Sequence, residues 1–230
     1  LLPQLAESVL PDGWWYEGAP AYHFYALAAL VRLAEAAHAA GIEVWRESAM
    51  KRLFDAPLLY TYPDLRFPAV NDSDVFSLKG QSALYEIAYA RLNDGRYLTL
   101  LDGDRRSREA LLWGVENVRV EQTPPLASHR FQGVGAAVLR AGEEADATYV
   151  HLDYGAHGGG HGHPDKLAVV LFALGKELAP DPGRLAYSVP AHGSWYRQSV
   201  AHNTLVMDQT SQAPTEGSLP FFAPGGAAPP

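Results

Sequence analysis

Apolar residues recur at three- and four-residue spacing across residues 21–40, a pattern that predicts an amphipathic helix. Gly41 supplies a natural C-terminal stop for it. A shorter pattern of the same kind covers residues 43–54, and further helices are expected at 82–92 and 107–115. The apolar positions of the first helix are Tyr22, Tyr25, Ala29, Leu30, Leu33 and Ala37. The first half of the chain is therefore predicted to be helical.

The pattern changes after Pro124 and Pro125, where short β-rich runs separated by Gly and Pro clusters begin. These runs predict strands at 133–139, 148–154, 167–174 and 202–207. Within the helical half, residues 57–74 form a long irregular stretch, and loops of that length are often functional. Helices first and strands second predict an α+β chain of two domains, which we divide into residues 1–122 and 123–230 with the border near 121–128.

Composition and net charge argue against several classes of function. The 230 residues are 47% apolar and 19% charged, which is typical of a globular chain. A net charge of −8 argues against a nucleic-acid partner, because such proteins carry a basic face. No apolar run reaches the roughly 18 residues of a membrane span. Cysteine is absent, so a metal site would have to use His, Asp, Glu or water.

The N-terminus, Leu1-Leu2-Pro3-Gln4, has no Met and none of the features of a signal peptide. We expect the chain to begin inside a longer protein whose targeting signal lies elsewhere. The lack of cysteine is compatible with the periplasm and with the cytoplasm, and it favours neither.

Histidines concentrate in the second half, around the run Gly-Gly-Gly-His-Gly-His-Pro-Asp-Lys at 158–166. Glycines allow the backbone to approach a ligand closely, and in an extended segment His161 and His163 would share one face. Asp181 lies in a tight turn after a predicted strand, and His202 opens another. Two histidines and an aspartate converging there would form a three-ligand metal site with one open position.

The histidine run is also compatible with two alternative structures. In the first, these residues are ordinary polar positions at strand ends and bind nothing. In the second, the chain is a cupin barrel, which uses a His-x-His pair as well. Cupins require a Glu four or five residues later, where this chain has Leu167 and Ala168, so the cupin structure is disfavoured.

Four blocks in this half, in order, resemble the β-sandwich of the heparinase II/III-like family. They are Gly-His-Gly-His-Pro-Asp-Lys-Leu at 160–167, Asp-Pro-Gly at 181–183, Trp-Tyr-Arg at 195–197 and Ala-His-Asn-Thr at 201–204. The resemblance implies a zinc ion held by His163, Asp181 and His202, structural rather than catalytic, with another divalent ion remaining possible. It also implies that His161 is an active-site or substrate-contacting histidine.

The N-terminal block at 12–23, Asp-Gly-Trp-Trp-Tyr-Glu-Gly-Ala-Pro-Ala-Tyr-His, resembles a stretch of the helical toroid in heparinase III-like and related alginate lyases. There the tyrosine of the Tyr-His pair transfers protons, which implies that role for Tyr22. Tyr25, one helical turn further, is the second candidate. Glu17 and His23 are expected to be structural. A tyrosine on the inner face of a helix is usually a core residue, so the role of Tyr22 depends on the block around it.

A lyase of this kind removes the C5 proton of a uronic acid and breaks the bond at O4, which requires a base, an acid and a neutralised carboxylate. Ionising a tyrosine at pH 7 costs about 4 kcal/mol, from its reference pKa of about 10. A cation such as His161 or Arg66 would offset part of that cost. The candidate substrate-binding residues are Tyr25, Arg66, Tyr187 and Arg197. For the loop residues Asn71, Asp72 and Asp74 we favour helix capping over substrate contact.

Taken together, these features predict an incomplete α/α toroid followed by an incomplete antiparallel β-sandwich. The expected function is that of a polysaccharide lyase acting on a glycosaminoglycan or alginate, in the periplasm or outside the cell rather than in the cytoplasm. The alternatives are a non-catalytic carbohydrate-binding or scaffold protein with a structural metal, and a metal-dependent hydrolase or oxygenase. The resemblance places the carboxylate-neutralising Asn or His upstream of this chain, so we expect the chain alone to be inactive.

Overall fold

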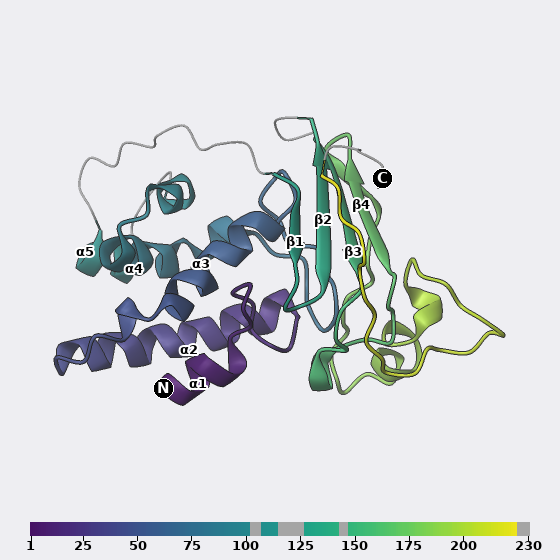
Figure 1. The fold of residues 1–230 in the computed structure, drawn as a ribbon, viewed down its shortest axis with the longest axis horizontal. Helices are drawn as coiled ribbons and strands as arrows, with labels where there is room; N and C mark the ends of the chain where they lie inside the picture. The colour runs from purple at the N-terminus through teal and green to yellow at the C-terminus, as the bar shows by residue number, and fades with distance from the viewer. Residues whose placement is uncertain (102–106, 115–126, 143–146, 225–230) are drawn as a thin grey trace.

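The computed structural model describes residues 1–101, 107–114, 127–142 and 147–224. A helical part is followed by one five-stranded antiparallel sheet, and the two parts lie side by side (Figure 1). The helices are α1 (Leu2–Ser8), α2 (Pro20–Ala39), α3 (Ser48–Tyr60), α4 (Ser82–Leu92) and α5 (Arg108–Trp113). The short helical turns are η1 (Val44–Arg46), η2 (Leu78–Gln81), η3 (Gly95–Leu100), η4 (Gly159–His161), η5 (His192–Tyr196) and η6 (Ser199–Ala201).

The predicted order of helices before an antiparallel sheet is confirmed, whereas the toroid itself stays a prediction. Most of the predicted border at 121–128 lies outside the described residues. Within the described part of the chain, no helix is both long enough and apolar enough to cross a membrane.

Helix α2 begins with Pro20 at its first turn and ends in a Schellman motif. Gly41 adopts φ +78°, and the Ile42 amide donates to the Ala37 carbonyl at 2.9 Å. The predicted apolar face is wrong by about one residue, since Tyr25 and Leu33 are 79% and 54% exposed. The face that is buried instead consists of His23, Phe24, Leu27, Leu30, Val31 and Ala34. Because Ala and Leu occur on all sides of this helix, periodicity alone could not select the inner face.

Helix α3 continues through Pro57 to Tyr60, four residues into the stretch predicted to be irregular. A proline in a helix has no N–H to offer to the carbonyl four residues earlier, here that of Leu53. The imidazole of His23 lies 2.9 Å from that carbonyl through Nε2, and its Nδ1 accepts from the Trp15 amide at 3.2 Å. His23 thus satisfies a backbone group that Pro57 leaves free, in keeping with the structural role expected for it.

The sheet is a simple meander in the order β1 (His129–Phe131), β2 (Ala136–Ala141), β3 (Thr148–Asp153), β4 (Val169–Ala173) and β5 (Lys176–Ala179). Three of the strands correspond to predicted runs, although β2 starts later than expected. The strand predicted at 202–207 is wrong, because these residues form bends and irregular chain, and Met207 makes only an isolated bridge to Thr210. The other layer of the predicted sandwich stays a prediction, since one sheet is all that the described ranges contain.

One hydrophobic core runs across the junction between the helices and the sheet. Alternate residues of neighbouring strands, among them Phe131, Tyr149 and Phe172, bury their side chains on the face toward the helical part. The Tyr149 hydroxyl donates to the Tyr60 carbonyl at 2.8 Å, and the rings of Tyr60 and Phe131 lie 5.2 Å apart in an edge-on arrangement. This shared core fixes the end of α3, and the loop that follows it, against the sheet.

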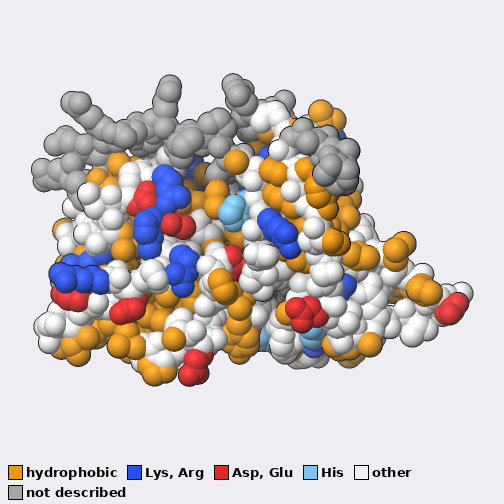
Figure 2. Space-filling model, viewed as in Figure 1, with side chains coloured by type: hydrophobic (Ala, Val, Ile, Leu, Met, Phe, Trp, Pro, Cys, Tyr) orange, Lys and Arg blue, Asp and Glu red, His pale blue; other side chains and the backbone are white. Residues whose placement is uncertain are grey.

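Several charged groups on the helical part lie in ion pairs. Figure 2 shows acidic and basic side chains next to one another over the helices. Lys51 lies 2.6 Å from Asp94, and Arg96 lies 2.7 Å from Asp55. Lys51 also pairs with Asp55, and Arg96 with Asp94, so these four half-buried side chains form one network, which contributes more to stability than isolated exposed pairs do.

Candidate functional site

Tyr22 and His161 meet where the helical part contacts the segment that follows β3. Their rings are stacked, with centroids 3.6 Å apart and planes inclined by 17°. The Tyr22 hydroxyl shares a 2.6 Å hydrogen bond with the hydroxyl of Tyr187. The structure thus brings together both residues expected to be catalytic and one expected to bind substrate, from three separate segments of the chain.

Glycines determine the shape of the turn that carries His161. Gly158 has φ +86°, and a Cβ there would lie 2.7 Å from the Glu17 carbonyl oxygen. A Cβ on Gly162 would lie within 1.5 Å of the His157 carbonyl oxygen. The turn is therefore closed in a way that only glycine permits at these positions.

The histidine segment is not extended throughout, because His161 lies in the helical turn η4 (Gly159–His161), so the shared face of an extended segment does not arise. His161 and His163 nevertheless converge, because both reach the same carboxylate. His161 Nδ1 lies 3.1 Å from Asp72 Oδ2, and His163 Nε2 lies 2.9 Å from Asp72 Oδ1.

Asp72 departs furthest from the role expected for it. A helix-capping residue would lie at the surface, yet this side chain is buried at the centre of the site with 1% exposure. The Tyr187 hydroxyl donates to Asp72 Oδ2 at 3.2 Å. Burial alone would raise the pKa of Asp72, but hydrogen bonds from His163 and His161 outweigh it and lower the pKa to about 2. Asp72 is therefore ionised at neutral pH and acts only as an acceptor.

The three predicted metal ligands, His163, Asp181 and His202, are all buried and offer ligand atoms within 4.8 Å of one another. His202 Nε2 lies 3.0 Å from the Tyr196 carbonyl, which can only accept, so Nε2 carries the proton. Nδ1 of the same ring faces Asp181 Oδ2 at 2.9 Å. Two imidazoles and a carboxylate form a donor set that suits a divalent ion.

The hydrogen bonds of His163, like those of His202, place the ring proton on Nε2 and leave Nδ1 able to bind a metal. Its Nε2 faces the ionised Asp72, which requires a proton on that nitrogen. Its Nδ1 is buried and has no hydrogen-bond partner among the residues that the structure describes. A buried, unpartnered ring nitrogen is costly unless something binds it, so this atom supports a metal site.

A second carboxylate lies next to the triad. Asp165 Oδ2 is 3.6 Å from His202 Nδ1, and burial together with the nearby Asp181 raises the pKa of Asp165. The adjacent Lys166 pairs with the buried Asp153 at 2.5 Å. Asp165 thus adds a second carboxylate beside Asp181 and His202, which favours a cation between these side chains.

The other three predicted substrate-binding residues lie at different distances from the tyrosine–histidine cluster. Tyr25 is largely exposed, and its ring lies 6.4 Å from that of Tyr22. Arg197 donates to the Gly162 carbonyl at 2.9 Å and so supports the glycine-histidine turn. Arg66 is not brought to the cluster, because it bonds Asp64 at 2.7 Å and lies over the rings of Tyr62 and Phe172.

Besides Asp72, two more residues near the cluster, Arg184 and Glu17, were not among the predicted site residues. Arg184 donates to Asp74 Oδ2 at 2.6 and 2.9 Å, and its guanidinium lies 6.0 Å from the centre of the Tyr187 ring. Glu17, expected to be structural, lies 3.4 Å from His161 Nε2. The sequence contains a hint of Arg184, because this arginine directly follows the Asp-Pro-Gly block. The sequence alone could not show that its side chain lies beside Tyr187.

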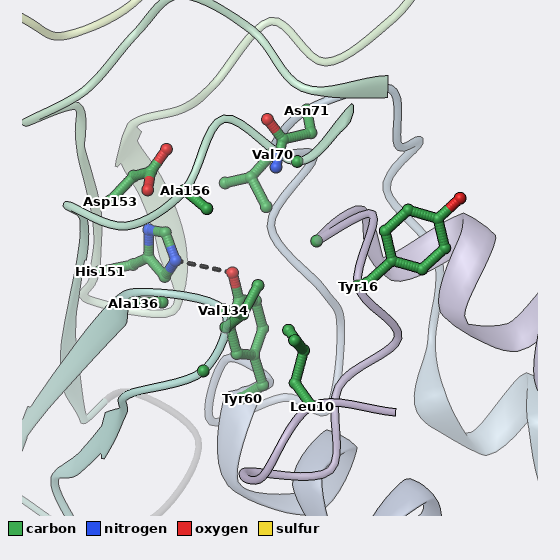
Figure 3. A pocket seen from close by; sticks show the side chains of 13 residues that line it. Leu10, Tyr16, Tyr60, Val70, Asn71, Val134, Ala136, His151, Asp153 and Ala156 are labelled. Atoms are coloured by element: carbon green, nitrogen blue, oxygen red, sulfur yellow. Dashed lines mark hydrogen bonds between the residues drawn. The ribbon is translucent and has the colours of Figure 1, made fainter. Parts of the chain in front are cut away.

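A separate small cavity of about 50 Å³ lies between the helical part and the sheet (Figure 3). Tyr16 and Asn71 line one side of it, and Tyr60, His151 and Asp153 the other. The Tyr60 hydroxyl and His151 Nε2 are 2.7 Å apart. Neither Tyr22 nor His161 lines this cavity, so it is distinct from the tyrosine–histidine cluster.

Comparison with known proteins agrees with this architecture. The model described as the heparinase II/III N-terminus matches residues 1–91, and the one described as heparinase II/III-like, C-terminal, matches residues 123–227. The chain therefore belongs to the heparinase II/III-like family, which confirms the resemblance seen in the sequence.

Several characterised relatives are similar along most of this chain. An alginate lyase of Stenotrophomonas maltophilia is 30% identical over 87% of it, and a heparin-sulfate lyase of Pedobacter heparinus is 22% identical over 93%. The chain spans 30% and 32% of the length of these two relatives.

Solved structures agree on the fold. A heparinase III with methylated lysines superposes with a TM-score of 0.80 at 22% identity, over 98% of this chain and 34% of that one. A heparan sulfate lyase from Pedobacter heparinus gives a TM-score of 0.72 at 22% identity, over 94% of this chain and 33% of the other.

Proposed function

We propose that the protein containing this chain is a polysaccharide lyase that cleaves a uronic-acid-containing polymer by β-elimination. The observation that carries the proposal is the contact of Tyr22 with both His161 and Tyr187. The relatives named alginate lyase and heparin-sulfate lyase support an acidic polysaccharide or oligosaccharide as substrate. The division at residues 122 and 123 into a toroid domain and a sandwich domain, and an exported location, are parts of the same proposal.

In this mechanism His161 is the base. Asp72 accepts the proton on His161 Nδ1, so Nε2 is the atom left to take the C5 proton of the uronate. The electron pair of the broken C5–H bond forms a double bond to C4, and the bond from C4 to O4 breaks. Glu17, 3.4 Å from Nε2, then faces the protonated imidazole.

Tyr22 is the acid that delivers a proton to the leaving O4. A neutral tyrosine can do this without ionising first, which avoids the cost of a phenolate. Burial, with the hydrogen bond to Tyr22, raises the pKa of Tyr187, so Tyr187 remains a protonated phenol beside it. The hydrogen bond between the two hydroxyls holds the Tyr22 oxygen in place next to the His161 ring.

His163, Asp181 and His202 would hold the metal, for which zinc is our assignment and another divalent ion the alternative. When bound, the ion supplies a cross-link between the glycine-histidine turn, the Asp-Pro-Gly turn and the segment after η6. These three residues thereby hold in place the segments that carry His161 and Tyr187. The role is structural and involves no proton transfer.

The test uses the full-length protein and a panel of heparin, heparan sulfate, alginate and hyaluronan. A lyase creates a double bond between C4 and C5, which absorbs in the ultraviolet and is followed continuously. We expect this absorbance with at least one polymer. Binding without any unsaturated product would indicate a carbohydrate-binding protein, and activity that chelators abolish and Tyr22→Phe leaves intact would indicate a metal-dependent hydrolase.

A further inference from the structure

The loop from Asn71 to Ser73 connects three parts of the site through short hydrogen bonds. Asn71 Oδ1 accepts from the His163 amide at 3.1 Å, and the Asp72 amide donates to the His161 carbonyl at 3.0 Å. Ser73 Oγ accepts from the Ala21 amide at 3.1 Å, one residue before Tyr22. The loop is therefore held on both sides, by the first turn of α2 and by the glycine-histidine turn.

The Asp72 carboxylate lies between the tyrosine–histidine cluster and the metal triad. Its Oδ2 faces His161 and Tyr187 at 3.1 and 3.2 Å, which are residues of the proposed reaction site. Its Oδ1 faces His163 Nε2 at 2.9 Å, in the metal triad. His192 Nε2 lies 3.5 Å from the same oxygen. A buried carboxylate is tolerated only with such a set of donors, and here they come from both sites.

Each oxygen of the Asp72 carboxylate determines which nitrogen of the facing histidine ring carries the proton. An ionised carboxylate only accepts, so it places a proton on His163 Nε2 and on His161 Nδ1. Of the opposite nitrogens, His163 Nδ1 has no hydrogen-bond partner among the described residues and is available to a metal, and His161 Nε2, which lies 3.4 Å from Glu17, is available to a substrate proton. Carboxylates that orient metal-binding histidines in this way commonly change metal affinity 10- to 100-fold when removed, a rough guide to the effect expected here.

We propose that Asp72 is a positioning residue that couples the metal triad to the tyrosine–histidine cluster. An ion on His163 Nδ1 makes the Nε2–H of that ring a stronger donor, which holds Asp72 Oδ1 more firmly. Oδ2 is then fixed opposite His161 and Tyr187. The coupling is reciprocal, because any energetic link between two sites acts in both directions. The part that concerns His161 rests on the proposed function, whereas the part that concerns metal affinity does not.

The first test measures zinc affinity of metal-free, full-length protein by competition with a coloured chelator. Asp72→Asn should bind zinc 10- to 100-fold more weakly than the unaltered protein, a rough range for loss of such a partner. Asp64→Asn is the matched control, because Asp64 forms an exposed pair with Arg66 away from the cluster, and its affinity should not change. Equal zinc affinity in Asp72→Asn and the unaltered protein would overturn the proposal.

The second test does not depend on the variant folding. In protein labelled with nitrogen-15 at histidine, addition of zinc should shift the ring resonances of His161, which is not a ligand, together with those of His163. If Asp72→Asn folds, the same addition should leave His161 unshifted. If the His161 ring resonances of the unaltered protein do not shift when zinc is added, the coupling is contradicted. Neither readout uses turnover, so a failure here is distinguishable from a failure of the lyase proposal.

Discussion

The ring of Tyr22 lies flat against the imidazole of His161, with 3.6 Å between their centroids. The first turn of a helix and a glycine-rich turn after a strand supply the two rings, so the contact exists only when both parts of the chain are folded together. Each side chain also reaches Tyr187, through a hydroxyl in one case and a ring nitrogen in the other. This three-membered cluster is the basis of the predictions below.

Removing the Tyr187 hydroxyl should slow the reaction without abolishing it. Tyr187→Phe removes the 2.6 Å hydrogen bond to Tyr22 and the bond to Asp72. Losing hydrogen bonds of this kind costs about 0.5–1.5 kcal/mol each, so we expect kcat to fall about tenfold, with a smaller change in KM. Steady-state kinetics of the full-length variant provide the measurement. A kcat equal to that of the unaltered protein would show that Tyr187 does not position Tyr22.

Glycine at position 162 should be essential for the shape of the turn, and glycine at 160 should not. A methyl group at 162 would lie 1.5 Å from a carbonyl oxygen, whereas at 160 it meets nothing within 4 Å. We expect Gly162→Ala to lower the free energy of unfolding by about 2 kcal/mol or more, and Gly160→Ala to change it by less than about 0.5 kcal/mol. Chemical denaturation measures both. Similar stabilities for the two variants would contradict the described turn.

Mild acid should destabilise the fold through two buried neutral histidines. Burial lowers the pKa of His23 and of His151 to about 4. Since the unfolded chain takes up a proton near its reference pKa of about 6.5, it binds more protons than the native state between about pH 6.5 and 4. Stability is therefore highest above this range and falls as the pH drops through it, by up to about 1.4 kcal/mol per pH unit for each histidine.

The contribution of one of these histidines can be isolated with His23→Gln. Glutamine keeps a donor for the Leu53 carbonyl but does not titrate. Urea unfolding curves at several pH values should show a shallower loss of stability for the variant in this range. An unchanged slope would mean that His23 is protonated in the native state or contributes nothing.

Removal of metal should lower stability, and replacement should restore it. A ligand that binds only the folded state stabilises it by about 2.7 kcal/mol at one hundred times its dissociation constant. Chelated protein should therefore melt at a lower temperature and recover with zinc. His202→Ala, which removes one member of the triad, should melt at the same temperature with and without zinc. A variant that still responds to zinc would place the ion elsewhere.

The sequence was sufficient for features that depend on local blocks. Gly41 ends its helix as predicted, and the three proposed ligands, separated by up to 39 residues, do lie together. The order of the blocks identified the family, because no single block is specific and only their combination is. The block around Tyr22 distinguishes it from its neighbours, whereas helical periodicity predicts the wrong inner face for α2.

Features that depend on contacts between distant segments could not be predicted. Asp72 reaches histidines 89 and 91 positions later, so nothing near it in the sequence distinguishes it from a capping residue. Arg66 and Arg184 are both exposed enough to bind a sugar acid, and only the fold shows that Arg184 is the one beside Tyr187. Strand propensity at 202–207 did not produce a strand, since a strand needs a neighbour to pair with.

The most direct test of the lyase account compares Tyr22→Phe with Tyr25→Phe in the full-length protein. Tyr22 contacts both His161 and Tyr187, whereas Tyr25 lies one turn away and is largely exposed. Formation of unsaturated product should fall by about 10²–10⁴-fold in Tyr22→Phe, the usual effect of losing a proton donor, and by far less in Tyr25→Phe. Full turnover in Tyr22→Phe, with zinc bound and the fold intact, would contradict the account.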